Sequence, residues 1–369
     1  ASFTYVTAQI NATGTIASRA LGIPFEAGVW VGLISILICS MLGGMRAVTW
    51  TQVAQYIVLI VAYLIPVFWI SSKVGGGVFP HLMLGDEVAR LGELEQQFGL
   101  VKNSAADMKA AGVPGGLKYI SGTHSGVPEG GMAVWKYLSL AICMMVGTAS
   151  LPHILMRYFT TPSVRAARKS VAWSLFFIFL LYSSAPMLAT LSKLALMDPN
   201  LPTGIIGKSI SDVQSIEWVQ RWSEVKQVFI ADFNGDGILQ LNEWFMRGDV
   251  VVLATPEVAG LPFVISGLVF AGGMAAAMST ADGLVLAISN ALSHDIYYKI
   301  IDPKADTRKR LLVARVLLVI IGAAGAYIAS FRLTSILGSV AWAFDFAMSG
   351  LFFPLVLGVW WKRATREGA

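Results

Sequence analysis

The chain has 369 residues, of which 56% are hydrophobic and only 13% are charged. A soluble domain of this length would carry about 25% charged residues, so that class is excluded. The formal net charge of +5 does not indicate nucleic-acid binding, because the basic residues fall between apolar runs. Cys39 and Cys143 both lie within apolar runs, so we expect no disulfide framework.

Eight apolar runs follow one another along the chain, most of them about 20 residues long, which is enough to cross a bilayer as a helix. We therefore predict an all-α polytopic membrane protein in the plasma (bacterial inner) membrane. Both ends of the chain fall within or just after an apolar run, so we expect a fragment of a longer transporter-like protein. The predicted spans are residues 3–19, 27–45, 53–70, 132–154, 171–194, 261–297, 311–331 and 335–361.

Lysine and arginine in the short connections predict the orientation, because cytoplasmic loops carry an excess of these residues. The connections "GGMRAVTW", "LMRYFTTPSVRAARKS", "YYKIIDPKADTRKR" and "WWKRATREG" are all basic. Alternating the eight spans puts all four connections on one side, which we expect to be cytoplasmic. Two long polar insertions, residues 71–131 and 197–250, are then extracytoplasmic.

The second insertion contains "DFNGDGILQLNE" at residues 232–243, which matches the EF-hand calcium loop. Gly237 falls at the sharp turn, and Leu239 falls at the apolar position expected to pack against flanking helices. The spacing predicts a structural Ca²⁺ site on an external loop, whereas the alternative is a surface turn that matches by chance. The predicted calcium ligands are Asp232, Asn234, Asp236, the Ile238 carbonyl, Gln240 and Glu243.

The sixth run contains "GGMAAAMSTADGLVLAIS", in which hydroxyl and carboxyl groups interrupt an apolar helix. Helical spacing aligns five small residues, which we call the polar stripe: Ala276, Ser279, Thr280, Gly283 and Ala287. The two hydroxyl groups and the carbonyl of Ala276 can direct oxygens to one point, which suits Na⁺. Close helix packing explains the same small residues equally well. Asp282 favours a functional role, because a carboxylate in a membrane needs a partner or a proton.

Several segments resemble the sodium:solute symporter family. They are "LVFAGGMAAAMSTADGLVLAISNALSHDIY" (268–297), "MLGGMRAVTWTQVAQY" (41–56), "GTASLPHILMRYFT" (147–160) and "PLVLGVWWKRAT" (354–365). Among the subfamilies, the chain is most similar to the large subunits of bacterial cation/acetate symporters.

The resemblance implies a LeuT-type fold of two inverted five-helix repeats, of which the eight spans would be core helices three to ten. It also implies that the family's sodium site maps onto the Ala276 carbonyl, Ser279 and Thr280. The remaining ligands of that site come from core helix one, which this sequence lacks.

Residues that bind the solute or couple it to the cation are predicted more broadly. Thr148 and Ser150 stand in "VGTASLPH", where Gly147 and Pro152 can interrupt a helix and free donors for a carboxylate; alternatively, the two hydroxyls satisfy a proline kink. Asp282 and Asp345 are intramembrane carboxylates and candidate coupling residues. Asp345 either couples protons or a second cation, or pairs with a residue in the helices that this sequence lacks.

The leading hypothesis is secondary active transport, in which Na⁺ influx drives uptake of a small organic solute such as acetate or another monocarboxylate. Transport breaks no bond, so we expect no enzyme activity. The alternative is a transporter-like sensor module that feeds a cytoplasmic signalling domain. Expected partners are the solute and the lipid bilayer, with a small membrane subunit as a further candidate and no nucleic acid.

Overall fold

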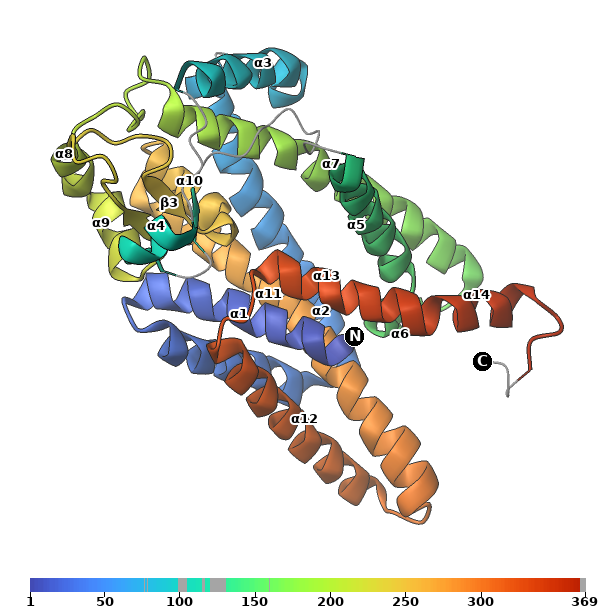
Figure 1. The fold of residues 1–369 in the computed structure, drawn as a ribbon. Coiled ribbons are helices and arrows are strands. Elements are labelled where there is room, and N and C mark those ends of the chain that lie inside the picture. Colours follow the sequence, from blue (N-terminus) through green and yellow to red (C-terminus); the bar gives the residue numbers. More distant parts are fainter. Residues whose placement is uncertain are drawn as a thin grey trace.

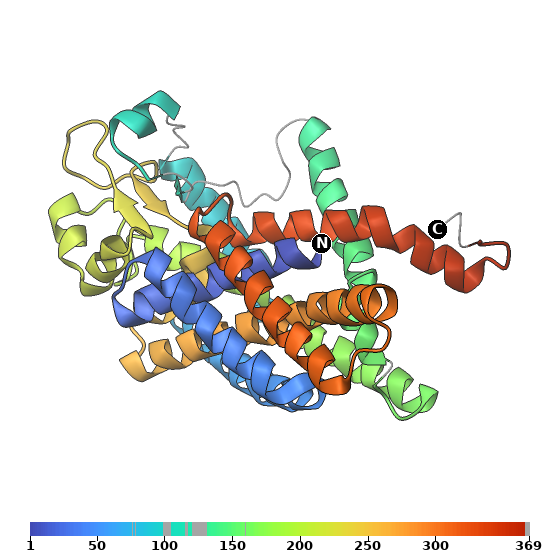
Figure 2. The ribbon, with the colours of Figure 1, turned by 90° about the horizontal axis from the view of Figure 1, so that it is seen from below.

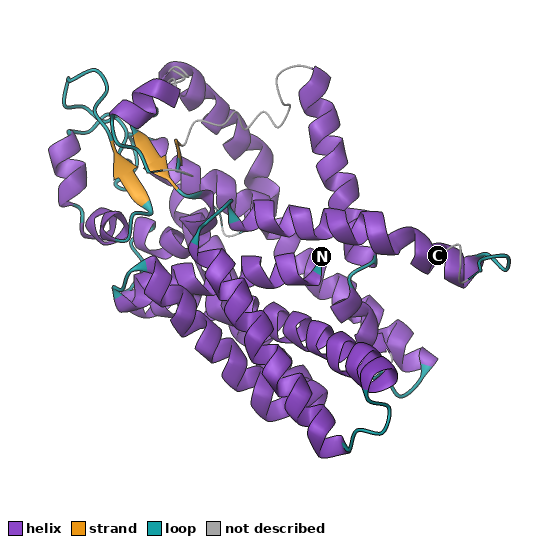
Figure 3. Ribbon diagram, turned by 60° about the horizontal axis from the view of Figure 1, so that its bottom comes forward, coloured by secondary structure: helices purple, strands orange, loops and turns teal. Residues whose placement is uncertain are grey.

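The computed structural model describes residues 1–75, 77, 79–98, 105–114, 117–119, 131–158 and 160–365. This part of the chain is mostly helical, as predicted, with short strands and loops in the insertions (Figure 3). Six of its helices are long and apolar enough to cross a membrane. They are Val48–Val74, Val134–Tyr158, Val164–Met197, Phe263–Ile301, Thr307–Ser330 and Ile336–Trp360.

The first two predicted spans are joined by a sharp bend. α1 (Ser2–Leu21) ends at Gly22, whose φ of 65° is the left-handed conformation that glycine adopts readily. Pro24 then precedes α2 (Phe25–Val74). α1 and the first part of α2, Phe25–Met41, are long and apolar enough to cross a membrane only when taken together, and they are bent by 113° relative to each other. α1 carries buried polar residues such as Gln9, which lower its hydropathy. In the described residues, the eight predicted spans therefore become six helices, or seven with the bent pair.

α2 corrects the predicted connection at "GGMRAVTW". The backbone is helical throughout this segment, so the predicted spans 27–45 and 53–70 belong to one helix of 50 residues. A glycine pair lowers helix propensity, but without a proline it does not end the helix. Figure 1 shows the two halves of α2, in dark and lighter blue, running in different directions.

α11 (Phe263–Asn290) lies at the centre of the helical part and packs against both α1 and α2. A Cβ atom at Gly272 would lie 2.5 Å from the Cβ of Ala62, and one at Gly14 would lie 2.6 Å from a methyl carbon of Val29. Small residues therefore allow these helices to approach closely, as is common in membranes. α11 continues into a π-helical segment, η2 (Ala291–Ile301).

The remaining apolar helices surround this centre. α5 packs closely against α13. Gly147 allows this approach, because a Cβ atom there would lie only 2.7 Å from the carbonyl oxygen of Phe344. Figures 1 and 2 show α14 extending away from the other helices toward the C-terminus. These elements are α5 (Gly131–Ala149), α6 (Pro152–Tyr158), α7 (Val164–Met197), α12 (Thr307–Ser330), α13 (Ile336–Ala347), η3 (Met348–Phe352) and α14 (Phe353–Trp360).

The two predicted insertions are joined in one three-stranded antiparallel sheet of order β1-β3-β2. Lys118 of the first insertion and Val228 of the second both pair with Met246. Trp244, on β3, is fully buried, and so is Trp222 of the second insertion. The elements are α3 (Pro80–Phe98), α4 (Ala105–Ala110), β1 (Lys118–Tyr119), α8 (Ile210–Ser215), α9 (Glu217–Glu224), β2 (Val228–Ile230), β3 (Trp244–Met246), η1 (Gly248–Val250) and α10 (Val251–Val258).

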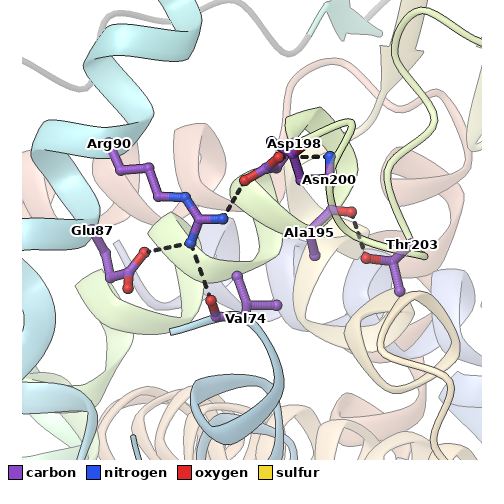
Figure 4. A network of polar contacts seen from close by, with 7 residues as sticks. All are labelled: Val74, Glu87, Arg90, Ala195, Asp198, Asn200 and Thr203. Carbon is purple, nitrogen blue, oxygen red and sulfur yellow. Dashed lines mark hydrogen bonds and ion pairs between the residues drawn. The ribbon is translucent and has the colours of Figure 1, made fainter. Parts of the chain in front are cut away.

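The charged side chain of Arg90 on α3 contacts residues at the C-terminal ends of α2 and α7 (Figure 4). Arg90 forms an ion pair with Asp198, and its Nη1 donates to the carbonyl of Val74 at 3.2 Å and contacts Glu87 at 3.5 Å. Asp198 also accepts the backbone N–H of Asn200 at 2.8 Å. The first insertion is thus bound to the helical part through side chains as well as through the chain.

Candidate functional site

The polar stripe brings its three predicted sodium ligands together on α11. The hydroxyl of Ser279 donates to the carbonyl of Ala276 at 2.9 Å, and the hydroxyl of Thr280 donates to the same oxygen at 3.3 Å. Three oxygens therefore meet within one helical turn. This geometry includes the helix back-bonding that serine and threonine make in membranes, and it leaves hydroxyl lone pairs for a cation.

Asp282 lies three residues after Ser279 on α11 and is completely buried. Its Oδ1 accepts the hydroxyl of Ser40 on α2 at 2.8 Å. Its Oδ2 is buried and has no hydrogen-bond partner within the described part of the chain. Because a buried oxygen of this kind is rarely left unpaired, Asp282 has capacity for a proton or a cation.

Gln52 of α2 also contacts this region, since its Nε2 donates to the carbonyl of Ser279 at 2.5 Å. Sequence reasoning missed both Gln52 and Ser40. Gln52 stands in the segment 41–56 that resembles a family signature, which is a signal that could have found it. Ser40 carries no such signal, because its contact with Asp282 joins residues 242 positions apart.

Gly283 lies one turn beyond Ser279 in the polar stripe and faces residues of α6. A Cβ atom there would lie 3.2 Å from Nη2 of Arg157 and 3.8 Å from Cδ2 of His153. His153 is buried, its ring packs edge-on against Tyr5, and its Nδ1 has no partner among the described residues. The missing side chain at Gly283 therefore lets a guanidinium and an imidazole approach α11.

The predicted break in residues 147–152 is present, because α5 ends at Ala149 and α6 begins at Pro152. Thr148 donates to the carbonyl of Met144 at 2.5 Å, and Ser150 donates to that of Val146 at 2.7 Å. Both hydroxyls thus pair with carbonyl groups at the end of α5. This geometry matches the proline-kink alternative, and it does not leave the two hydroxyls as free donors for a solute.

Asp345 lies on α13 with its side chain exposed. Its backbone carbonyl accepts the hydroxyl of Ser349 at 2.8 Å. In the described residues its carboxylate is not part of an ion pair, so Asp345 stands apart from the contacts around Asp282.

The predicted calcium loop lies between β2 and β3, not between helices, which corrects the expected flanking structure. Its carboxylates accept the loop's own donors: Asp232 those of Gly235 and Gly237, and Glu243 those of Phe233 and Gln240.

No group of three or more His, Cys, Asp or Glu side chains that could hold a metal ion occurs among the described residues. This structure therefore gives no support for calcium binding, and the ligand set Asp232, Asn234, Asp236, Ile238, Gln240 and Glu243 stays a prediction.

The loop is nevertheless well ordered by hydrogen bonds. Gly237 has a φ of 72°, as the sharp turn requires, and Leu239 is fully buried. The backbone N–H of Ile238 holds the pKa of Asp236 below its usual value, with help from the side chains of Asn234 and Gln240. Internal hydrogen bonds thus stabilise the loop in this structure, whereas the sequence motif predicts that a bound ion stabilises it.

Comparison with known proteins gives a family match over most of the chain. The model described as the sodium:solute symporter family matches residues 1–209 and 250–369, leaving out much of the second insertion. An uncharacterized symporter of Cupriavidus necator is 38% identical over 443 residues and covers 100% of this chain. The monocarboxylic acid transporter of Corynebacterium glutamicum is 25% identical and covers 99% of this chain. The chain spans 64% and 57% of the lengths of these two relatives.

Among solved structures, a substrate-bound, outward-open Na⁺-coupled sialic acid symporter is similar in fold. The alignment has a TM-score of 0.60 and 16% identity, and covers 98% of this chain and 62% of the other. The predicted all-α transporter architecture is confirmed by this likeness.

Proposed function

Because this chain belongs to the sodium:solute symporter family, we propose that it forms part of a transporter that couples Na⁺ influx to the uptake of a small organic solute. The observation that carries the proposal is the convergence of the Ala276 carbonyl with the hydroxyls of Ser279 and Thr280. A carbonyl and two hydroxyls are hard, neutral oxygen ligands of the kind that hold Na⁺ in membrane helices. The relatives in this family are transporters, so no chemical step is assigned.

Asp282 supplies the negative charge of the proposed cation site. It follows Ser279 by three residues on α11, which places the two side chains on neighbouring positions of the helix surface. Asp282 is buried and has one oxygen without a partner in the described region. A full negative charge close to three neutral oxygens strengthens the attraction for a cation in a region of low dielectric. Ser40 fixes the orientation of the carboxylate through its hydrogen bond.

The proposed solute is a monocarboxylate, and acetate is the compound to test first. Support comes from the relative described as a monocarboxylic acid transporter. It also comes from Arg157 and His153, which approach α11 at Gly283, one turn beyond Ser279. A guanidinium binds a carboxylate through two parallel hydrogen bonds, and the unpartnered Nδ1 of His153 adds a third polar group.

Coupling requires that cation and solute stabilise the same conformation. The polar stripe and Gly283 occupy successive turns of one helix, so ligands at both positions bear on the same element. In this proposal Na⁺ binding sets the position of α11 against α6, and the solute binds where those two helices meet.

The proposal is tested by uptake of labelled acetate into proteoliposomes that contain the full-length protein. We expect uptake to require an inward Na⁺ gradient. Ser279→Ala and Thr280→Ala should each raise the Na⁺ concentration for half-maximal uptake about tenfold, equivalent to about 1.4 kcal/mol, and Thr280→Ser should keep most of the activity.

Ser174→Ala is the matched control, because Ser174 makes the same kind of helix back-bond on α7, at 2.9 Å from Ser170. Arg157→Gln should raise the half-saturating acetate concentration and leave the Na⁺ dependence unchanged. If uptake requires Na⁺ but is unchanged by Ser279→Ala and by Thr280→Ala, the cation does not bind at the polar stripe of α11.

A further inference from the structure

α12 packs one of its faces against the rest of the protein and leaves another exposed. On the packed side, a Cβ atom at Gly322 would lie 2.8 Å from a methyl carbon of Leu33, and the carbonyl of Ala314 accepts the hydroxyl of Ser289 at 2.7 Å. Figure 1 shows α12 at the lower edge of the helical part, beside η2. The large apolar side chains of the exposed face are Leu311, Leu312, Val316, Val319 and Ile320.

Arg315 lies within this exposed apolar face. Its side chain is exposed, and Leu312 and Val319 are its neighbours on the helix surface, one turn before and one turn after. Arg315 stands about 12 Å along the helix from Thr307, the first residue of α12, at about 1.5 Å per residue. A charge at this depth on the outside of a membrane helix is unfavourable unless it reaches polar groups or pairs with an opposite charge.

The described part of the chain supplies no opposite charge for Arg315, because none of its ion pairs includes this residue. Two neighbouring basic residues, by contrast, are engaged. Lys309 pairs with Asp302 at 2.8 Å, and the guanidinium of Arg310 lies 4.3 Å from the centre of the Tyr298 ring. The ligand of Arg315 must therefore come from outside the described residues.

Arg308 adds a second charge on the same side of α12. It is exposed and takes part in no ion pair among the described residues. Residues seven apart are about 20° apart around a helix and about 10 Å apart along it, so Arg308 lies between Arg315 and the membrane surface at which α12 begins. Helical side chains lean toward the N-terminus of their helix, so we expect the guanidinium of Arg315 to reach back toward Arg308.

This arrangement selects an anionic phospholipid as the ligand. A guanidinium binds phosphate oxygens through paired hydrogen bonds, and anionic lipids attract basic residues at the membrane surface. A soluble anion is confined to the water near Arg308, whereas a lipid carries its phosphate into the membrane interface, where a long side chain such as Arg315 places its charge. The exposed apolar residues on either side of Arg315 match the acyl chains of the same molecule.

We propose that the exposed face of α12 binds one anionic phospholipid, with its phosphate on Arg315, its headgroup beside Arg308, and an acyl chain along Val316 and Val319. The basic connections predict that this lipid belongs to the cytoplasmic leaflet. The bound lipid neutralises a charge that the described residues leave unpaired, and it holds the first turns of α12 at the membrane surface. The inference does not depend on which solute the protein transports.

The test titrates the full-length protein, delipidated in detergent, with phosphatidylglycerol and with phosphatidylcholine, and measures bound lipid by native mass spectrometry. We expect phosphatidylglycerol to bind more tightly than phosphatidylcholine, whose headgroup has no net charge. Arg315→Gln should weaken phosphatidylglycerol binding about fivefold, and Arg308→Gln/Arg315→Gln about 25-fold, because each basic residue near an anionic surface contributes roughly a factor of five.

Arg165→Gln/Arg168→Gln is the matched control, because it removes two charges from the first turns of α7. Both residues are exposed and take part in no ion pair among the described residues, and the basic connections predict that they lie on the same side of the membrane. The control should bind phosphatidylglycerol as the unaltered protein does. Thermal unfolding of both double variants verifies that they fold.

Three outcomes would overturn the proposal. If glycerol phosphate displaces the bound phosphatidylglycerol, the site takes a free phosphate and not a lipid. If Arg315→Gln leaves phosphatidylglycerol binding unchanged, Arg315 pairs with another part of the full-length protein or is solvated by water. If the control variant loses as much binding as Arg308→Gln/Arg315→Gln, the lipid follows the overall positive charge and α12 holds no specific site.

Discussion

Glu243 is the acidic residue that the 232–243 loop buries completely. Its two oxygens accept the backbone N–H groups of Phe233 and Gln240 at 2.9 and 3.0 Å. The same side chain closes an EF-hand loop when a cation is bound. Here it closes the loop by accepting two backbone hydrogen bonds, so its contribution to stability does not require a metal.

We predict that Glu243→Gln destabilises the loop by about 1–3 kcal/mol, because the new amide N–H₂ would face a backbone N–H and leave it unpaired. Hydrogen exchange of residues 232–243 measures this, once with calcium and once with a chelator. We expect the same loss of protection in both conditions, and no effect of the chelator on the unaltered protein. If Glu243→Gln lowers exchange protection only when calcium is present, the loop binds calcium and this prediction is wrong.

Asp236 makes the loop sensitive to pH. Its pKa is held below the usual value of 3.8 by the backbone N–H of Ile238, and the side chains of Asn234 and Gln240 add to the effect. A lowered pKa means that the ionised form stabilises the fold above the unfolded pKa, and that this contribution is lost as pH falls through the folded pKa. Exchange protection of the loop should therefore hold from neutral pH to about pH 4 and decline below it. Asp236→Asn should remove this pH dependence; if the variant still shows the same decline, another group titrates.

Among the elements, α3 depends on α7 through a second ion pair. Lys193 and Glu95 are only 8% and 7% exposed, whereas Arg221 and Glu217, on α9, are 53% and 76% exposed. Removing one member of a buried pair leaves an uncompensated charge, but an exposed pair contributes little.

We predict that Lys193→Met weakens the attachment of α3 by about 3–5 kcal/mol, and that adding Glu95→Leu restores most of the loss. Arg221→Gln is the control and should change stability by less than about 1 kcal/mol. The readout is hydrogen exchange of α3 in the full-length protein. If the double variant is as unstable as Lys193→Met, packing and not charge holds α3 in position.

The sequence predicts local features of these elements better than their contacts. Ala276, Ser279 and Thr280 could be assigned to one face because helical spacing is a property of consecutive residues. The contacts of Ser40 with Asp282 and of Gln52 with Ser279 join distant residues, and no spacing rule predicts them. The two-residue strand β1 is likewise too short to have a pattern, so the sheet shared by the insertions was not foreseen.

For the whole molecule, hydropathy predicts the class and most of the membrane helices, but it misjudges two boundaries. The segment around residues 43–50 is polar enough to suggest a loop and yet is helical. α1 is a helix whose buried polar residues reduce its apolar character. In α1, packing inside the protein accommodates the polar side chains, and hydropathy does not measure that packing.

The orientation in the membrane stays a prediction of the basic connections. In the full-length protein with Cys39, Cys143 and any cysteine outside this chain replaced by alanine, we expect Asn234→Cys to react with an impermeant thiol reagent in intact cells. Lys304→Cys, in the connection before α12, should react only after the membrane is permeabilised. Both positions are exposed, so burial does not limit either reaction. Labelling of both from the same side would contradict the predicted topology.

The hydrogen bonds of the polar stripe also bear on how a transported ion leaves. The Ala276 carbonyl already accepts two hydroxyl hydrogen bonds, so a cation that binds the same oxygen competes with those bonds. Exchanging two such bonds at about 0.5–1.5 kcal/mol each would weaken binding by roughly five- to 150-fold. The two hydroxyl hydrogen bonds that re-form when the ion departs compensate part of its lost contacts, which shortens the ion's residence time. A transporter must release its ion in every cycle, and these two hydroxyls would make that release fast.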